Sequence, residues 1–114
     1  LDDFKLPEGV DKPVMIGEFH FGALDRGMFH PSLIQVENQE ARGKAYATYI
    51  ASALRHPNIV GAHWHQYGEQ PTTGRFDGEN LQNGFLDVCD TPYPETITGI
   101  REVGYRMYQI RSGK

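Results

Sequence analysis

Two short apolar segments constrain the fold of this 114-residue chain more than any other feature. The first covers Val14–Gly17 and the second covers Ile59–His65, and neither shows a clean polar–apolar alternation. Such segments are typical of strands that are buried on both faces, as in parallel sheets. Between them, about Asn38–Arg55, apolar residues recur at spacings of three and four and predict a helix. Strands joined by a helix pair in parallel through a right-handed crossover.

Signals at the ends of the helices support this order of elements. Asn38 fits the N-cap of the first helix, and Pro57 ends it because proline disfavours the α conformation in the preceding residue. A second helix begins within Thr91–Pro94, since proline is tolerated in a first turn. Its buried stripe is predicted at Ile97, Ile100, Val103, Met107 and Ile110. The fold class is therefore α/β, in the order strand, helix, strand, helix.

Two parallel strands alone make an incomplete sheet, because both faces need cover and both outer edges stay unpaired. The chain starts at Leu1 and has no signal-peptide hydrophobic region there, so we expect residues 1–114 to be part of a longer protein. The single cysteine, Cys89, excludes an internal disulfide. The net charge of −4 and the lack of a Lys- or Arg-rich block argue against nucleic acid, and no apolar run is long enough for a membrane span.

Polar side chains gather directly after both predicted strands, which is the end where parallel α/β folds bind ligands. Glu18 and His20 follow the first strand. A carboxylate at the end of a buried strand fits a nucleophile or a general base. The structural alternative is a strand-end carboxylate that pairs with Arg26 or Arg75, and residue chemistry alone does not separate the two interpretations.

The end of the second strand carries an aromatic residue between two histidines. Trp64 is either a platform for a sugar ring or a core residue. His63 and His65 share the opposite side of the strand, because side chains alternate. Together with His20 and Glu18 they would form a metal cluster, but an H-x-H pair is a weak signal. If Trp64 points into the site, the histidines on either side of it point away. We therefore interpret the histidines as structural and expect no metal.

The long segment Gln66–Thr91 is rich in glycine, and a compact domain seldom carries such a loop unless it binds something. Its polar residues either hydrogen-bond sugar hydroxyls or form a solvated loop; they include Arg75, Asp77, Glu79, Asn80 and Asn83. Cys89 has no activating base beside it. The sequence contains no P-loop, dinucleotide fingerprint or nucleophile elbow, which excludes those classes of site.

Three stretches carry a resemblance to a known family: KPVMIGEFHFGALDRGMFHP, HPNIVGAHWHQYGEQPTTGR and GENLQNGFLDVCDTPYPETI. Over nearly its whole length the chain resembles the C-terminal part of the catalytic domain of family 50 glycoside hydrolases, the β-agarases. More distantly it is similar to the clan of retaining glycosidases built on (β/α)8 barrels. The resemblance implies that residues 1–114 are the C-terminal quarter of such a TIM barrel, a βαβα piece with strands 7 and 8 and helices 7 and 8.

In that clan, strand 7 ends in the catalytic nucleophile, a glutamate, and strand 8 ends in an aromatic residue that floors the sugar site. Glu18 matches the first position and Trp64 the second. His20 is expected to bind substrate or to orient Glu18. Further sugar contacts are expected from Gln66, Tyr67, Glu69 and Arg75.

The resemblance implies hydrolysis of β-galactosidic linkages in agarose or neoagaro-oligosaccharides by double displacement, without a cofactor. The clan's acid/base lies in an Asn-Glu pair after strand 4, and this sequence has no such pair in that place. We therefore expect the chain to supply the nucleophile only and to be inactive when isolated. Its partners would be a galactan or agarose-type oligosaccharide and the missing strands, from another chain or by self-association. The family also implies a secreted or periplasmic location.

Two other interpretations remain open. The first is a non-catalytic galactan- or agarose-binding module, because the acid/base is absent. The second is an assembly subunit that has no ligand, in which Glu18 and Trp64 would affect neither sugar binding nor activity.

Overall fold

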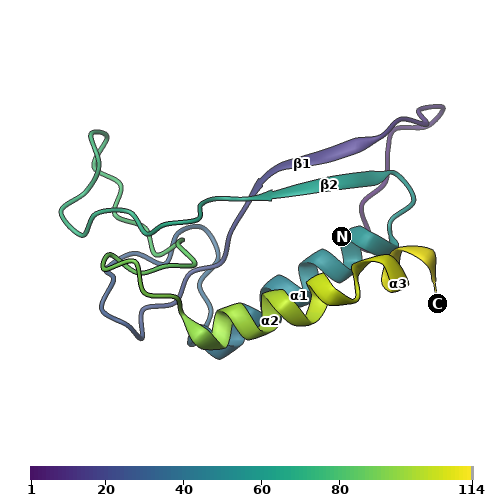
Figure 1. Ribbon diagram of the computed structural model, residues 1–114. Coiled ribbons are helices and arrows are strands. Elements are labelled where there is room, and N and C mark those ends of the chain that lie inside the picture. Colours follow the sequence, from purple (N-terminus) through teal and green to yellow (C-terminus); the bar gives the residue numbers. More distant parts are fainter. Residues whose placement is uncertain (114) are drawn as a thin grey trace.

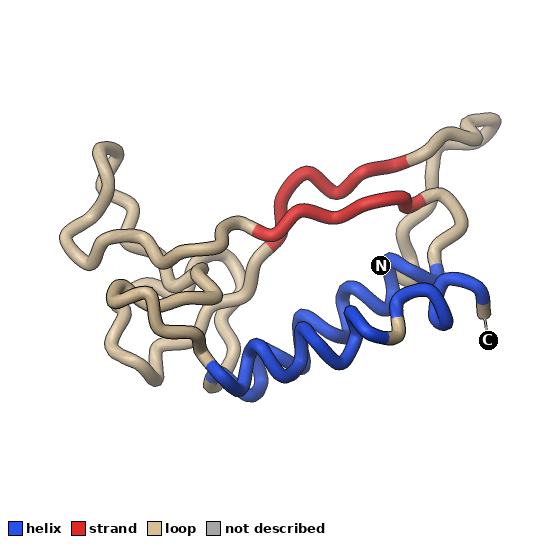
Figure 2. The backbone as a smooth tube through the Cα atoms, viewed as in Figure 1, coloured by secondary structure: helices blue, strands red, loops and turns tan. Residues whose placement is uncertain are grey.

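The computed structural model describes residues 1–113. Its elements are β1 (Val14–Phe19), α1 (Gln39–Arg55), β2 (Ile59–Trp64), α2 (Pro94–Tyr105) and α3 (Met107–Ser112). The two strands form a parallel sheet that lies along one side of the helices (Figure 1). The predicted α/β order is thus confirmed. Long loops follow both strands and gather at the strands' carboxyl ends, where they form most of one end of the molecule (Figure 2).

The helix ends agree with the sequence signals in one case and differ in another. The Asn38 side chain accepts the Ala41 N–H at 2.9 Å, as predicted for an N-cap. The second helix, predicted as one piece, is divided at Arg106, whose φ and ψ of −102° and 2° leave the α region. Gly104 lies two residues before this break, and glycine weakens a helix.

The contact between α1 and α2 is built on small and polar residues instead of the predicted apolar stripe. A Cβ on Gly99 would lie 2.4 Å from the Gly43 carbonyl oxygen, so the two backbones touch here. Thr96 is fully buried and donates its hydroxyl to Gln39. Of the five residues predicted for the stripe, Val103 alone is buried. The stripe prediction was wrong because close backbone approach, not side-chain size, decides which face of α2 meets α1.

Aromatic side chains fill the space between the carboxyl end of the sheet and α1. Phe19 stacks on Tyr49 and Trp64 stacks on Phe85, with ring centroids 4.5 and 4.8 Å apart. Elsewhere the sheet is poorly covered: the side chains of Met15 and Val60 are more than half exposed, and no third strand pairs with the sheet within residues 1–113. None of the helices in this part of the chain is long and apolar enough to span a bilayer.

Candidate active site

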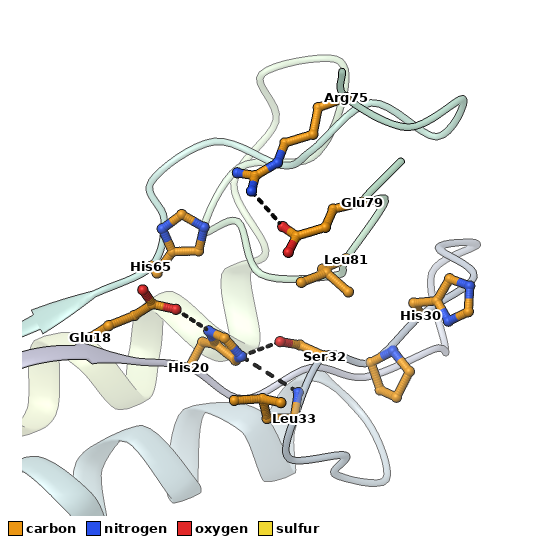
Figure 3. A pocket seen from close by; sticks show the side chains of 10 residues that line it. Glu18, His20, His30, Ser32, Leu33, His65, Arg75, Glu79 and Leu81 are labelled. Atoms are coloured by element: carbon orange, nitrogen blue, oxygen red, sulfur yellow. Dashed lines mark hydrogen bonds and ion pairs between the residues drawn. The ribbon is translucent and has the colours of Figure 1, made fainter. Parts of the chain in front are cut away.

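A pocket of about 430 Å³ opens at the carboxyl end of the sheet (Figure 3). This volume lies in the range of small-molecule sites. Three parts of the chain build the pocket: the end of β1, the loop after β1 and the loop after β2. The residues that line it are Glu18, His20, His30, Pro31, Ser32, Leu33, His65, Arg75, Glu79 and Leu81.

Glu18 presents a free carboxylate to this pocket. It lies near the end of β1, where the pairing with β2 becomes irregular between Ile16 and Phe19. Its side chain is 60% exposed, and Nδ1 of the His20 imidazole lies 3.8 Å from its Oε1. The two arginines of the structural alternative have other carboxylates as partners, Arg26 with Glu95 and Arg75 with Asp77. The structure therefore does not show Glu18 paired with either arginine.

His20 lies directly behind Glu18 and is itself buried. Its Nε2 faces the Ser32 hydroxyl and the Leu33 backbone N–H, and its Nδ1 faces Glu18 (Figure 3). Burial lowers the pKa of His20; Glu18 opposes this effect, whereas His65 and Arg42 add to it. At neutral pH the imidazole is therefore uncharged, which suits a group that touches both a loop amide and a carboxylate.

We expect the free energy of unfolding to fall on acidification because of His20. Its pKa in the folded chain lies below the ordinary value of 6.5, so the unfolded chain binds the additional proton first as the pH drops. The contribution of His20 is complete above 6.5 and is lost as the pH falls through the lower, folded value. Urea unfolding at about pH 7.5 and about pH 5.5 should show this loss. An equally large loss in His20→Asn would contradict the assignment.

Arg75 is held by its own loop at the rim of the pocket. Its Nε and Nη2 bind both oxygens of Asp77 at 2.9 and 2.7 Å, and Nη2 also lies 2.9 Å from Glu79. The hydrogen bonds from Arg75 lower the pKa of Asp77 to about 2, and they raise the pKa of Arg75. Gln70 donates to Glu79 from the other side at 3.1 Å. The pocket rim is therefore a fixed ion-pair cluster that can donate to and accept from sugar hydroxyls.

Trp64, predicted as the sugar platform, is placed elsewhere. It does not line the pocket but packs among Phe19, Tyr46 and Phe85 on the side of α1. Its indole N–H donates to the backbone carbonyls of Gln66 and Asn83, so its polar atom is already used. Trp64 is half-buried in this packing, and its role as a sugar platform stays a prediction. His65 lines the pocket.

Glu69, predicted as a sugar contact, organises the loop after β2. Its Oε1 accepts the N–H groups of Asn83 and Gly84 at 2.6 and 2.8 Å, and its Oε2 accepts from Gln82 and Tyr93 at 2.7 and 2.8 Å. This leaves little acceptor capacity for a ligand. Burial and the bond to Glu69 raise the pKa of Tyr93.

The two remaining predicted contacts also lie outside the pocket. Gln66 donates its amide to the Gly68 carbonyl at 3.0 Å, within its own loop. Tyr67 has a side chain that is 69% exposed, and its backbone carbonyl accepts from Phe85. Of the six predicted substrate contacts, only His20 and Arg75 line the pocket together with Glu18.

Replacing Glu69 by alanine is expected to loosen the loop after β2. Each hydrogen bond to the carboxylate contributes about 1.5–3 kcal/mol, so the Asn83 and Gly84 amides should exchange with solvent roughly 10- to 100-fold faster. Hydrogen exchange by NMR measures this, with exposed Glu37→Ala as the matched control. Unchanged exchange together with weaker sugar binding would instead support the predicted sugar contact.

A buried arginine joins the two loops that carry the pocket. Arg42 of α1 has no exposed surface, and it donates to the carbonyls of Phe21 and Gly84 at 2.7 Å each and to Gln39 at 3.2 Å. Its guanidinium also lies 5.2 Å from the centre of the Trp64 ring. Burial lowers the pKa of Arg42 to about 10, so it remains a cation at neutral pH. The sequence offered no signal for this role, because an arginine in an amphipathic helix ordinarily faces solvent.

Glu79, one of the polar loop residues that the sequence offered as sugar contacts, lines the pocket, whereas His30, Ser32 and His65 were not predicted as pocket residues. His65 was assigned to the face opposite the site by alternation along the strand. Because β2 ends at Trp64, His65 lies beyond the strand and the alternation rule does not reach it. Within residues 1–113, no three His, Cys, Asp or Glu side chains are grouped as metal ligands are.

Known proteins similar to this chain are β-agarases. β-Agarase B of Vibrio sp. (strain JT0107) is 44% identical over 111 residues, which are 96% of this chain and 12% of that protein. β-Agarase A of the same strain is 46% identical over 102 residues, which are 89% of this chain and 10% of that protein. The solved structure of an exo-β-agarase matches with a TM-score of 0.85 at 50% identity and covers 88% of this chain and 14% of that one.

No protein-family model matches the chain. The solved structure of PfGH50B also matches, with a TM-score of 0.85 at 46% identity over 88% of this chain and 14% of that one. Together these matches confirm the resemblance to family 50 glycoside hydrolases that the motifs predicted. The chain spans 10–12% of the length of the two Vibrio relatives, so the match concerns one small part of those proteins.

Proposed function

We propose that this chain is the nucleophile-bearing part of a β-agarase-like retaining glycoside hydrolase, with Glu18 as the nucleophile. Residues 1–114 would be the C-terminal quarter of a (β/α)8 barrel, with β1 and β2 as strands 7 and 8. The observation that carries the proposal is the exposed Glu18 carboxylate, with His20 beside it, in a pocket at the carboxyl end of a parallel strand. In β/α barrels this end holds the catalytic residues. The substrate class is β-galactosidic linkages of agarose or its oligosaccharides.

The proposed reaction is a double displacement. An oxygen of Glu18 attacks the anomeric carbon, and the bond to the leaving oxygen breaks with its electron pair passing to that oxygen. Water then attacks the anomeric carbon of the ester and releases Glu18. The two displacements together retain the configuration of the sugar. His20 and Arg75 remain candidates for hydroxyl contacts, and His65 and Glu79 join them because they line the same pocket.

A second carboxyl group, roughly 5 Å from the first, must protonate the leaving oxygen in a retaining enzyme. Glu79 is the other carboxylate that lines the pocket. Its Oε2 accepts a hydrogen bond from Gln70 and pairs with Arg75, so these two neighbours already engage this oxygen. We therefore place the acid/base outside this chain, on strands that complete the barrel. Met15 and Val60 on the sheet are more than half exposed, as expected if further strands cover them. These strands would come from another chain or from self-association.

The test uses an aryl β-galactoside whose leaving group departs without a proton. The chain should release about one equivalent of the aryl alcohol in a burst and then stall, because the ester lacks a general base for its hydrolysis. Glu18→Gln should show no burst, and Glu102→Gln on the exposed face of α2 should keep it. A well-folded monomer in sedimentation would argue against completion of the barrel by self-association. The absence of a burst would argue against ester formation on Glu18.

A non-catalytic sugar-binding module is the second candidate, and the engagement of Glu79 by Arg75 and Gln70 favours it over a complete enzyme. It predicts saturable binding of agarose oligosaccharides that Glu18→Gln leaves unchanged, without any burst. Titration followed by NMR distinguishes it from the nucleophile proposal.

A further inference from the structure

We infer that His20 is a positioning residue for Glu18, held by the segment Pro31–Leu33 in the neutral tautomer that carries its proton on Nδ1. The role of Glu18 as nucleophile rests on the function proposed above, whereas the tautomer rests on geometry alone. The arrangement comprises a backbone amide, an imidazole and a carboxylate in sequence, and each contact fixes the next (Figure 3).

The Leu33 amide sets the tautomer. A backbone N–H can only donate, and that of Leu33 points at Nε2 of His20 from 3.5 Å. Nε2 must therefore be an acceptor, and the Ser32 hydroxyl on the same nitrogen can donate to it as well. A neutral imidazole whose Nε2 accepts carries its hydrogen on Nδ1.

The Nδ1 atom is a buried donor that lacks a hydrogen-bond partner within residues 1–113. Oε1 of Glu18 lies 3.8 Å from it, beyond hydrogen-bond distance. Glu18 is the more exposed of the two side chains and is free to turn, whereas His20 is fixed by its other nitrogen. A small rotation of the carboxylate closes the contact. A buried donor is costly when unpaired, so this rotation is favoured and selects one orientation of Glu18.

The loop that holds His20 is shaped for this contact. Ser32 has a φ of 72°, a left-handed conformation that costs a non-glycine residue energy and is found where function requires it. The Leu33 side chain is 86% exposed, so its packing does not hold the loop in place. Gly22 does: a Cβ there would lie 2.0 Å from the Pro31 carbonyl oxygen, and its N–H donates to Ile34 at 3.0 Å. The glycine two residues after His20 thus lets the loop fold back onto the imidazole.

Nitrogen-15 NMR of the chain tests the tautomer directly. We expect Nδ1 of His20 to give a protonated, pyrrole-type resonance and Nε2 an unprotonated, pyridine-type resonance at neutral pH. The Nδ1 proton should exchange faster with water in Glu18→Ala than in the wild type. The opposite pair of resonances, or a proton whose exchange ignores Glu18, would overturn the inference. This readout does not depend on any sugar chemistry.

Two conservative variants test positioning. The amide nitrogen of asparagine replaces Nδ1, and that of glutamine replaces Nε2, where it would oppose the Leu33 N–H. We expect His20→Asn to keep most of the rate of ester formation on Glu18 with an activated 2-fluoro-galactoside, and His20→Gln to lose about 100-fold, the effect of misplacing a reacting group by about 1 Å. Thermal unfolding of both variants controls for folding. Equal rates in the two variants would overturn the inference. If the wild type formed no ester, the proposed function would be overturned, and the NMR result would decide the tautomer by itself.

Discussion

Replacing Arg42 by methionine is expected to lower the free energy of unfolding by about 3 kcal/mol, a large part of the stability of a small domain. The change leaves the carbonyls of Phe21 and Gly84 buried without their donor, and an unsatisfied buried group costs about 1–3 kcal/mol. It also removes a cation that interacts electrostatically with the loop carboxylate of Glu69. Relief of the buried charge offsets part of this loss, so the net effect is smaller than the sum.

Urea unfolding followed by circular dichroism measures this effect. Arg55→Met on the same helix is the matched control, because Arg55 is exposed and pairs with Asp2 at 3.6 Å; we expect a change within about 0.5 kcal/mol. Arg42→Lys should fall between the two, since a lysine keeps the charge but lacks the planar fork that reaches both carbonyls. An Arg42→Met chain as stable as the wild type would show that this arginine does not hold the two loops together.

Glu18→Gln is expected to reduce the rate of ester formation with activated galactosides by at least about 1,000-fold, because the amide has no charged oxygen to attack the anomeric carbon. Binding of the sugar should persist, since the amide is nearly isosteric with the carboxylate. Glu79→Gln removes the other pocket carboxylate and is expected to weaken sugar binding while the chemistry at Glu18 continues. If Glu79→Gln abolished ester formation and Glu18→Gln did not, Glu79 would be the nucleophile and Glu18 would be the sugar-binding carboxylate.

The elements of the fold were predictable because their signals are local. The Asn38 cap, the stop before Pro57 and the apolar runs of the strands each act within a few residues, and the structure has them where the sequence placed them. The packing of α2 was not predictable, because it depends on the contact of Gly43 with Gly99, which lie far apart in the sequence. The spacing of apolar residues along a helix does not show which of its faces can approach another backbone closely.

The site was predictable at the ends of the strands and much less so in the loops. Glu18 and His20 follow an apolar strand directly, so their place at the pocket mouth follows from the order of the chain. Trp64 and Glu69 remain predicted sugar contacts, but neither lines the pocket, and both have long-range partners, Phe85 and Tyr93 among them. Those partners come from the loop after β2, whose path is set by hydrogen bonds that a sequence pattern does not encode.

Peptide mapping of the trapped chain identifies the residue that acts as the nucleophile. The chain is incubated with a 2-deoxy-2-fluoro-galactoside that carries a good leaving group, digested, and analysed by mass spectrometry. We expect a fluorogalactosyl ester on the peptide that contains Glu18, released by hydroxylamine and absent from Glu18→Gln. An ester on another carboxylate such as Glu79, or sugar bound at the pocket without any ester, would contradict it.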